Sequence, residues 1–274
     1  MRNIALIVGY DGTDYSGFQC QPHGNTIQDH LEQAIFVLSG ERVKLHGSGR
    51  TDAGVHATGQ VANFHTTSSI PAERWALALN ARLPNDIVIH SAFSVPDHFH
   101  ARRGAIRKTY CYTINCNRIP NLFQRRYEFH HPLPLDFQAM QQGLVYLLGE
   151  HDFTSFTSPL SKKASHVRTI LDARLELEPA SVNVLTESNL YHTSEWDEQH
   201  YPGMQRGVIR LYVSGNGFLY NMVRIIAGTL IQVGERKRKP EEVATILEAK
   251  DRSKAGPTAV PHGLTLCEVE YEQF

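Results

Sequence analysis

The order of strand-like and helix-like segments in the first hundred residues limits the possible folds most strongly. Four short apolar runs are typical of strands: 3–8, 43–46, 60–65 and 86–95. Between them, helical apolar spacing predicts helices over 26–38 and 71–82, the first opened by a capping box of Thr26 and Asp29 and ended by Gly40. The order β-α-β, loop, β-α-β is that of a ferredoxin-like layer, in which helices cover one face of an antiparallel sheet.

The rest of the chain repeats this order loosely. Further strands are predicted over 108–115, 167–177, 208–214 and 264–271, and helices from Asp136, over 218–233 and from Pro240. We therefore predict an α+β fold of two ferredoxin-like (RNP-like) halves, joined in a mixed, mostly antiparallel sheet with helices on one face and a central cleft. The halves are assigned to 1–106 and 107–274. Residues 178–206 have no clear period and indicate an insertion in a hairpin of the second half.

Composition argues against a membrane protein and a disulfide-bonded one. The chain has 274 residues, and no apolar run approaches the roughly 20 residues that a membrane span needs. The apolar run 4–8 is too short for a signal peptide, so a cytoplasmic protein is expected. The four cysteines contain no C-x-x-C pair, which favours isolated buried thiols over a zinc or disulfide framework.

Charge is distributed unevenly along the chain. The chain holds 27 basic and 28 acidic residues, but 178–206 alone contains five acids and one base, so the remainder carries 26 basic and 23 acidic residues. Basic clusters lie at 102–103, 107–108, 125–126, 162–163 and 236–239. Such clusters suit a nucleic-acid backbone, because each neutralised phosphate releases a counterion, although solvated surface is the simpler alternative for any one of them.

A glycine-rich segment, 46–60, contains Asp52, the main candidate for a functional carboxylate. An ordinary tight loop is one interpretation. A dinucleotide-binding loop is another, since Gly47 and Gly49 follow a predicted strand. That alternative fails because Asp52 stands at the third glycine position, where a carboxylate would repel a pyrophosphate, and no Lys-Ser/Thr follows to make a P-loop.

The segment GRTDAGVHATGQ at 49–60 resembles the signature of the tRNA pseudouridine synthase A (TruA) family. Seven further segments resemble family motifs in the same order: YDGTDYSGFQ at 10–19, TIQD at 26–29, NARLPNDI at 80–87, FHAR at 99–102, KTYCY at 108–112, DFTSF at 152–156 and NGFLYNMVR at 216–224. The resemblance therefore extends over nearly the whole chain. Residues 178–206 depart from it, being longer and more acidic than the usual hairpin, and either sit away from RNA or regulate access to it.

The resemblance implies conversion of a uridine in tRNA to pseudouridine without metal or cofactor, most often at positions 38–40 of the anticodon stem-loop. A paralogue with another target position is the alternative. Asp52 matches the catalytic residue, which either attacks C1′ or removes the proton at C2′. Because the uracil is a good leaving group and never departs, one carboxylate is chemically sufficient, whereas a glycosidase needs two.

The same resemblance assigns supporting roles to other residues. Arg224 matches the arginine that pairs with the catalytic carboxylate and holds it ionised. Tyr110 matches the ring that packs on the target uracil, although a core-facing aromatic is the simpler interpretation of its strand. Arg50 matches the residue that fills the space left when the base flips out of the stack. His100 and Arg102 are expected in the RNA-facing cleft.

The sequence leaves two alternative functions to weigh, a metal site and a non-catalytic RNA-binding module, and the resemblance also implies an oligomeric state. His98 and His100 on alternate positions could suggest a metal site, but no Cys or carboxylate stands at ligand spacing. A non-catalytic RNA-binding module would need an RNP1-like motif, which the sequence lacks, and would leave Asp52 and Arg224 unexplained. The family forms homodimers, so tRNA and a second copy of the chain are the expected partners.

Overall fold

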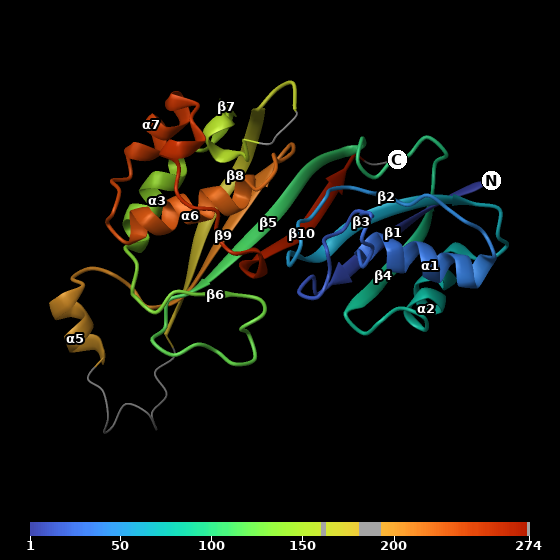
Figure 1. Ribbon diagram of the computed structural model, residues 1–274, viewed down its shortest axis with the longest axis horizontal. Coiled ribbons are helices and arrows are strands. Elements are labelled where there is room, and N and C mark those ends of the chain that lie inside the picture. The colour runs from blue at the N-terminus through green and yellow to red at the C-terminus, as the bar shows by residue number, and fades with distance from the viewer. Residues whose placement is uncertain (160–162, 181–192, 273–274) are drawn as a thin grey trace. The chain divides into compact units, whose positions relative to one another are not determined.

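The computed structural model describes residues 1–159, 163–180 and 193–272 (Figure 1). The chain divides into two compact units, one made of Met1–Tyr110 and Leu264–Phe274, the other of Cys111–Gly263. The sequence placed the boundary at 106/107 and the closing strand in the second half. In the structure that strand belongs to unit 1 instead, because it pairs with a strand of the first half.

Unit 1 is built on a sheet whose strand order follows the ferredoxin-like plan. Its strands are β1 (Arg2–Tyr10), β2 (His46–Gly47), β3 (His56–Thr66), β4 (Ile87–Val95) and β10 (Leu264–Tyr271). The order is β4-β1-β3, with the short β2 paired to β3, all antiparallel. β10 adds to β3 in parallel, at Thr265–His56 and Leu266–Ala57. Of the strand predicted over 43–46, only His46 lies in a strand, so the rest of that prediction is wrong. The last five residues of the glycine-rich segment, 56–60, form the beginning of β3.

Two helices cover one face of this sheet (Figure 1). Helix α1 (Ile27–Ser39) begins at the predicted capping box, in which the Thr26 hydroxyl accepts from Asp29 N and the Asp29 carboxylate accepts from Thr26 N. Helix α2 (Trp75–Asn80) is shorter than predicted, because Ala72–Arg74 form a 3₁₀ turn before it. Trp75 is fully buried and packs edge-on against the Phe64 ring at a centroid distance of 5.2 Å.

Unit 2 contains a second, mostly antiparallel set of strands. β5 (Ala105–Asn115) enters it from unit 1 and is followed by β6 (Phe129–His130), β7 (Gly149–Asp152), β8 (Val167–Pro179) and β9 (Gly207–Gly215). β8 pairs antiparallel with both β7 and β9, and β6 pairs in parallel with β5. The α+β class and the mostly antiparallel pairing are therefore confirmed, while the central cleft stays a prediction.

The helices of unit 2 are α3 (Phe137–Val145), α5 (Thr193–His200), α6 (Met222–Gly234) and α7 (Glu242–Ala249). Asp136 caps α3 as predicted, accepting from Ala139 N at 3.0 Å. Helices α3, α6 and α7 lie together on one side of the strands (Figure 1). Nearly every side chain of α6 is buried, as its apolar sequence indicated.

Two helix starts and one loop assignment in unit 2 need correction. Helix α6 begins four residues later than predicted, because Asn221 takes a left-handed conformation with φ 62°. Helix α7 begins at Glu242, so Pro240 lies before it and not at its first position. The insertion 178–206 holds the end of β8 and helix α5, while 181–192 lie outside the described residues, as does Lys162 of one basic cluster.

The cysteines and the helices bear on two further expectations. Cys111 and Cys116 are buried as predicted, whereas Cys20 is exposed. Within residues 1–159, 163–180 and 193–272, no helix combines the length and the apolar composition required to cross a bilayer.

Candidate active site

The half-buried Asp52 lies in the loop that joins β2 to β3. The backbone of this loop is held on both sides of the carboxylate. Phe18 N donates to Thr51 O at 3.1 Å, and Val55 N closes a turn on Asp52 O at 3.1 Å. Backbone hydrogen bonds on both sides of Asp52 therefore fix the loop, in addition to the strands that it connects.

A buried side-chain network holds the residues before Asp52. The Ser48 hydroxyl donates to Gln60 Oε1, and Gln60 Nε2 donates in turn to Gly49 O at 2.9 Å. The Tyr10 hydroxyl lies 2.8 Å from Thr51 Oγ1, and burial raises the pKa of Tyr10 to about 12, so the phenol stays protonated and able to donate. Because these buried groups satisfy one another, moving the loop would leave several of them without partners.

Two glycines allow the segment that follows β1 to approach the Asp52 loop closely. Gly17 has φ 89°, and a Cβ placed there would lie 2.7 Å from Thr51 O. A Cβ on Gly12 would lie 2.0 Å from Val55 O. Any side chain at either position would push the Asp52 loop away, which gives a physical reason for the glycines in this segment.

Tyr110, on β5, lies beside the same loop. It is buried, and a Cβ on Gly49 would lie 3.8 Å from its hydroxyl. Burial raises the pKa of Tyr110, and the nearby Tyr10 and Asp52 raise it further. Tyr110 is thus a neutral, largely buried ring within electrostatic reach of the Asp52 carboxylate.

Lys108 is a member of this site that the sequence did not single out. Its ammonium donates to Ser48 O at 2.6 Å, and burial, with a smaller contribution from Arg102, lowers the pKa of Lys108 to about 8. The available signal was spacing, because Lys108 and Tyr110 stand two apart on one strand and so share a face.

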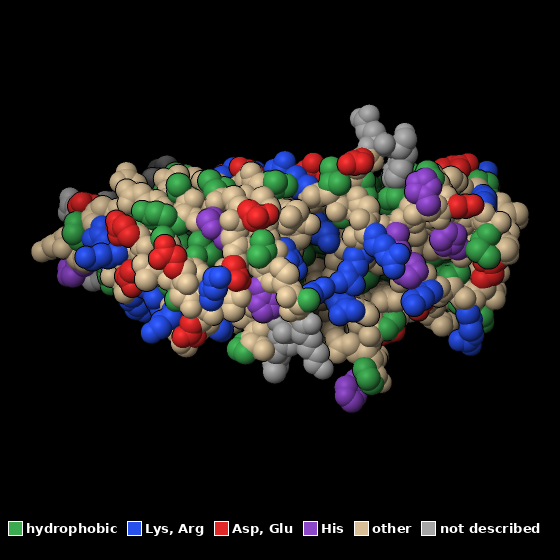
Figure 2. All heavy atoms as spheres, turned by 90° about the horizontal axis from the view of Figure 1, so that it is seen from above, with side chains coloured by type: hydrophobic (Ala, Val, Ile, Leu, Met, Phe, Trp, Pro, Cys, Tyr) green, Lys and Arg blue, Asp and Glu red, His purple; other side chains and the backbone are tan. Residues whose placement is uncertain are grey.

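Three of the expected RNA-contacting residues line one cavity of about 410 Å³: Arg50, His100 and Arg102. All three belong to unit 1, Arg50 in the Asp52 loop and the other two after β4. Figure 2 shows a group of Lys and Arg side chains with His side chains beside it on one face. The structure therefore brings these three residues together next to the loop that carries Asp52.

Arg224 lies in unit 2, in the first turn of α6. Its Nε donates to Ala259 O at 2.7 Å and its Nη1 donates to Asn221 Oδ1 at 3.0 Å. Ala259 N returns a bond to Arg224 O at 3.1 Å. The guanidinium is thus positioned within its own unit, and its pairing with Asp52 stays a prediction.

The suggestion of a metal site at His98 and His100 finds no support in the part of the chain that the structure describes. There, no group of three or more His, Cys, Asp and Glu side chains is arranged to hold a metal ion. His100 instead packs beside His46, with ring centroids 4.6 Å apart and ring planes tilted by 37°.

Comparison with known proteins decides the family. A family model described as tRNA pseudouridine synthase matches residues 6–102 and 144–272. The chain belongs to the tRNA pseudouridine synthase family. It is 44% identical over 271 residues to the tRNA pseudouridine synthase A of Brevibacillus brevis, covering 99% of this chain and 100% of that protein. The corresponding Caldicellulosiruptor saccharolyticus enzyme is 45% identical at the same coverage, and the Bacillus subtilis enzyme is 43% identical over 98% of this chain and 99% of its own.

The match to the tRNA pseudouridine synthase family includes most of the residues described above. Asp52, Arg50, His100 and Arg102 fall in its first segment and Arg224 in its second. Tyr110 and Lys108 lie between the matched segments, so their place beside the Asp52 loop rests on the geometry of β5. As a member of the family, the chain is an isomerase that acts on uridine in tRNA.

Proposed function

We propose that this tRNA pseudouridine synthase isomerises uridine at positions 38–40 of the anticodon stem-loop, with Asp52 starting the reaction. The observation that carries the proposal is the loop of Asp52, whose neighbours are held by Phe18, Gln60 and Tyr10. A carboxylate held in this way is pre-organised toward one position of a bound substrate.

The chemistry requires one bond to break and another to form at the same sugar carbon. The C1′–N1 bond breaks, the uracil turns within the site, and C5 bonds to C1′, after which C5 loses its proton and N1 takes one up, so that the product is an isomer of the substrate. Asp52 either attacks C1′ as a nucleophile or removes the C2′ proton as a base. The uracil never leaves, so no second carboxylate is needed to protonate a departing group.

The supporting residues have distinct roles in this proposal. Arg224 supplies a positive charge that holds the Asp52 carboxylate ionised and oriented. Tyr110 covers one face of the flipped uracil, for which its buried position beside Gly49 is suitable. Arg50 fills the gap that the flipped base leaves in the RNA stack, and His100 and Arg102 contact the RNA.

The decisive test is Asp52→Asn, because the amide has nearly the shape of the carboxylate but can act as neither nucleophile nor base. With unmodified tRNA labelled with tritium at uridine C5, tritium release should fall by at least about a thousandfold, a loss typical of removing a catalytic group. The affinity for tRNA should stay within a few-fold of wild type. Asp172→Asn, at a half-exposed position of β8, is the control, and this variant should convert tRNA at the wild-type rate.

Substantial release of tritium by Asp52→Asn would overturn the assignment of Asp52. If the wild-type protein bound tRNA but released none, the non-catalytic RNA-binding alternative would hold instead. Mapping pseudouridine in tRNA from cells with and without the gene tests the target position. Loss at positions other than 38–40 would identify a paralogue with another target.

The proposal extends to the assembly and its location. We place the enzyme in the cytoplasm as a homodimer whose two copies grip tRNA together, as its family resemblance implies. A symmetric pair would gather dispersed basic clusters into one surface, which a net charge of −1 per chain allows. Light scattering at micromolar concentration should give twice the mass of the chain, and the mass of one chain would contradict the dimer.

A further inference from the structure

The cavity next to the Asp52 loop has an unusual lining. Six of the residues around its roughly 410 Å³ are cationic or can become so: Lys44, His46, Arg50, His100, Arg102 and Arg103. None of its described lining residues is acidic. We refer to it as the basic pocket.

The four permanent cations of the basic pocket are exposed and lie near one another. Among the ion pairs of the described residues, none joins Lys44, Arg50, Arg102 or Arg103 to a carboxylate. Holding four positive charges together without acids costs repulsion, which a bound anion would relieve. Because the charges line a hollow, their field is also focused there, although the whole chain has a net charge of −1.

The position of the basic pocket indicates which anion it takes. Arg50 lines the pocket and stands two residues before Asp52 in the same loop. An anion held there by an RNA substrate would be a backbone phosphodiester close to the reacting nucleotide. The cavity has room for one such group together with water.

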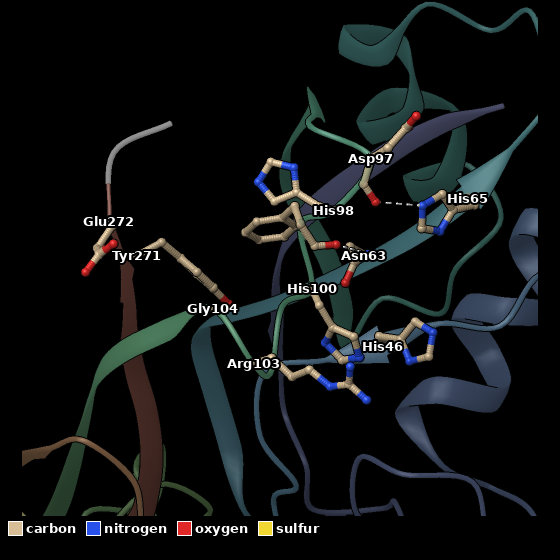
Figure 3. A pocket seen from close by; sticks show the side chains of 11 residues that line it. His46, Asn63, His65, Asp97, His98, His100, Arg103, Gly104, Tyr271 and Glu272 are labelled. Atoms are coloured by element: carbon tan, nitrogen blue, oxygen red, sulfur yellow. Dashed lines mark hydrogen bonds between the residues drawn. The ribbon is translucent and has the colours of Figure 1, made fainter.

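The neighbouring hollow is a poorer site for a phosphate. It has a volume of about 560 Å³ and shares His46, His100 and Arg103 with the basic pocket, but Asp97 and Glu272 also line it. Figure 3 shows His46, His100 and Arg103 close together, with Asp97 and Glu272 farther out on opposite sides. The carboxylates would repel a phosphate there, so the acid-free basic pocket is favoured.

We propose that the basic pocket binds a phosphodiester of the tRNA backbone beside the reactive uridine, and that protonation of His46 and His100 strengthens this grip. The inference rests on the proposed function, since it names the part of the substrate that this site holds. It adds Lys44, His46 and Arg103 to the residues that bind the substrate.

Burial and the positive charges of the basic pocket lower the pKa of the two histidines in its lining, His46 and His100. Burial lowers the pKa of His46, and His100, Lys44, His65 and Arg103 lower it further. Burial likewise lowers the pKa of His100, with Arg103 and Arg102 adding to the effect. Both rings are therefore mostly neutral at neutral pH in the protein without RNA.

A bound phosphate shifts the pKa of His46 and His100 in the opposite direction. Its negative charge favours the imidazolium form and raises the pKa of both rings, so binding takes up protons. By linkage, whatever takes up protons on binding binds more tightly as the pH falls. The phosphodiester itself does not titrate in this range, so the pH dependence belongs to the histidines.

The first experiment measures the salt dependence of tRNA binding, in an Asp52→Asn background so that the substrate is not converted. Lys44→Gln and Arg103→Gln should each weaken binding several-fold and reduce the slope of log affinity against log salt by about 1, as expected for a lost phosphate contact. Arg82→Gln removes an exposed arginine of the same unit that lies outside the pocket, and should change neither quantity.

The second experiment compares affinity at about pH 6 and about pH 8, on either side of the ordinary histidine pKa. The parent should bind several-fold more tightly at the lower pH, and the His46→Gln/His100→Gln double variant should lose this difference. His90→Gln, which removes an exposed histidine of β4, should keep it.

The proposal is overturned if the pocket variants match Arg82→Gln in affinity and salt slope, or if the double variant keeps the pH dependence of the parent. Thermal melting checks that each variant folds. If the double variant does not fold, the affinity and salt slope of Lys44→Gln, a change at an exposed position, still test whether the pocket contacts a phosphate. Tritium release by the wild-type enzyme tests the proposed function separately, so either claim can fail while the other stands.

Discussion

At the scale of single residues, Lys108 leads to a prediction about stability. Its folded-state pKa of about 8 lies below the ordinary value of 10.5, chiefly because of burial. Between these two pH values the unfolded chain binds more protons at this residue than the folded chain does. The contribution of Lys108 to the free energy of unfolding therefore rises with pH across this window.

Comparing wild type with Lys108→Met isolates this contribution. Going from about pH 8 to about pH 10, urea unfolding should show the wild type gaining stability relative to the variant, because methionine has no proton to lose. Lys44→Met, which removes an exposed lysine of the same unit, should follow the wild type at both pH values. A difference between wild type and Lys108→Met that does not change with pH would mean that Lys108 is not desolvated.

Also at this scale, local motifs in the sequence single out candidate residues but not the contacts between them. Of the candidates Asp52, Arg50, His100 and Arg102, the last three line one cavity, while the roles of all four stay predictions. The bond from Lys108 to Ser48 joins residues 60 positions apart, so no local pattern reveals it. His46 was missed for the same reason, since its partner ring, His100, lies on another segment.

At the scale of elements, predictions held where short-range signals decide the structure. The capping box of α1 joins residues three apart, and Asp136 caps α3 in the same way. Predictions failed where the backbone conformation of one residue decides. Asn221 at φ 62° delays α6, although the apolar pattern runs on through Phe218 and Leu219. β2 shrinks to His46–Gly47, although Val43 and Leu45 have the alternation of a strand.

At the scale of the whole molecule, the sequence indicated two related halves but not how the chain closes. β10 returns from the end of the chain to β3, so β3 lies between β1 and β10, the first and last strands. The pair Thr265–His56 joins residues more than 200 positions apart, and pairings of that kind have no local signature. The loop that carries Asp52 ends where β3 begins at His56, so the C-terminal strand β10 supports the strand that follows Asp52.

Leu266→Ala tests that support. Leu266 is fully buried in β10 opposite Ala57, and truncating a buried leucine typically costs about 2–5 kcal/mol of stability. We expect a loss in that range by urea unfolding, and faster amide hydrogen exchange in β3 and β1 than in β8 of unit 2. Leu77→Ala, in α2 at a residue that is 78% exposed, is the matched control and should change stability by less than about 0.5 kcal/mol. If Leu266→Ala behaved like this control, or loosened β8 as much as β3, then β10 would not be what stabilises the sheet behind Asp52.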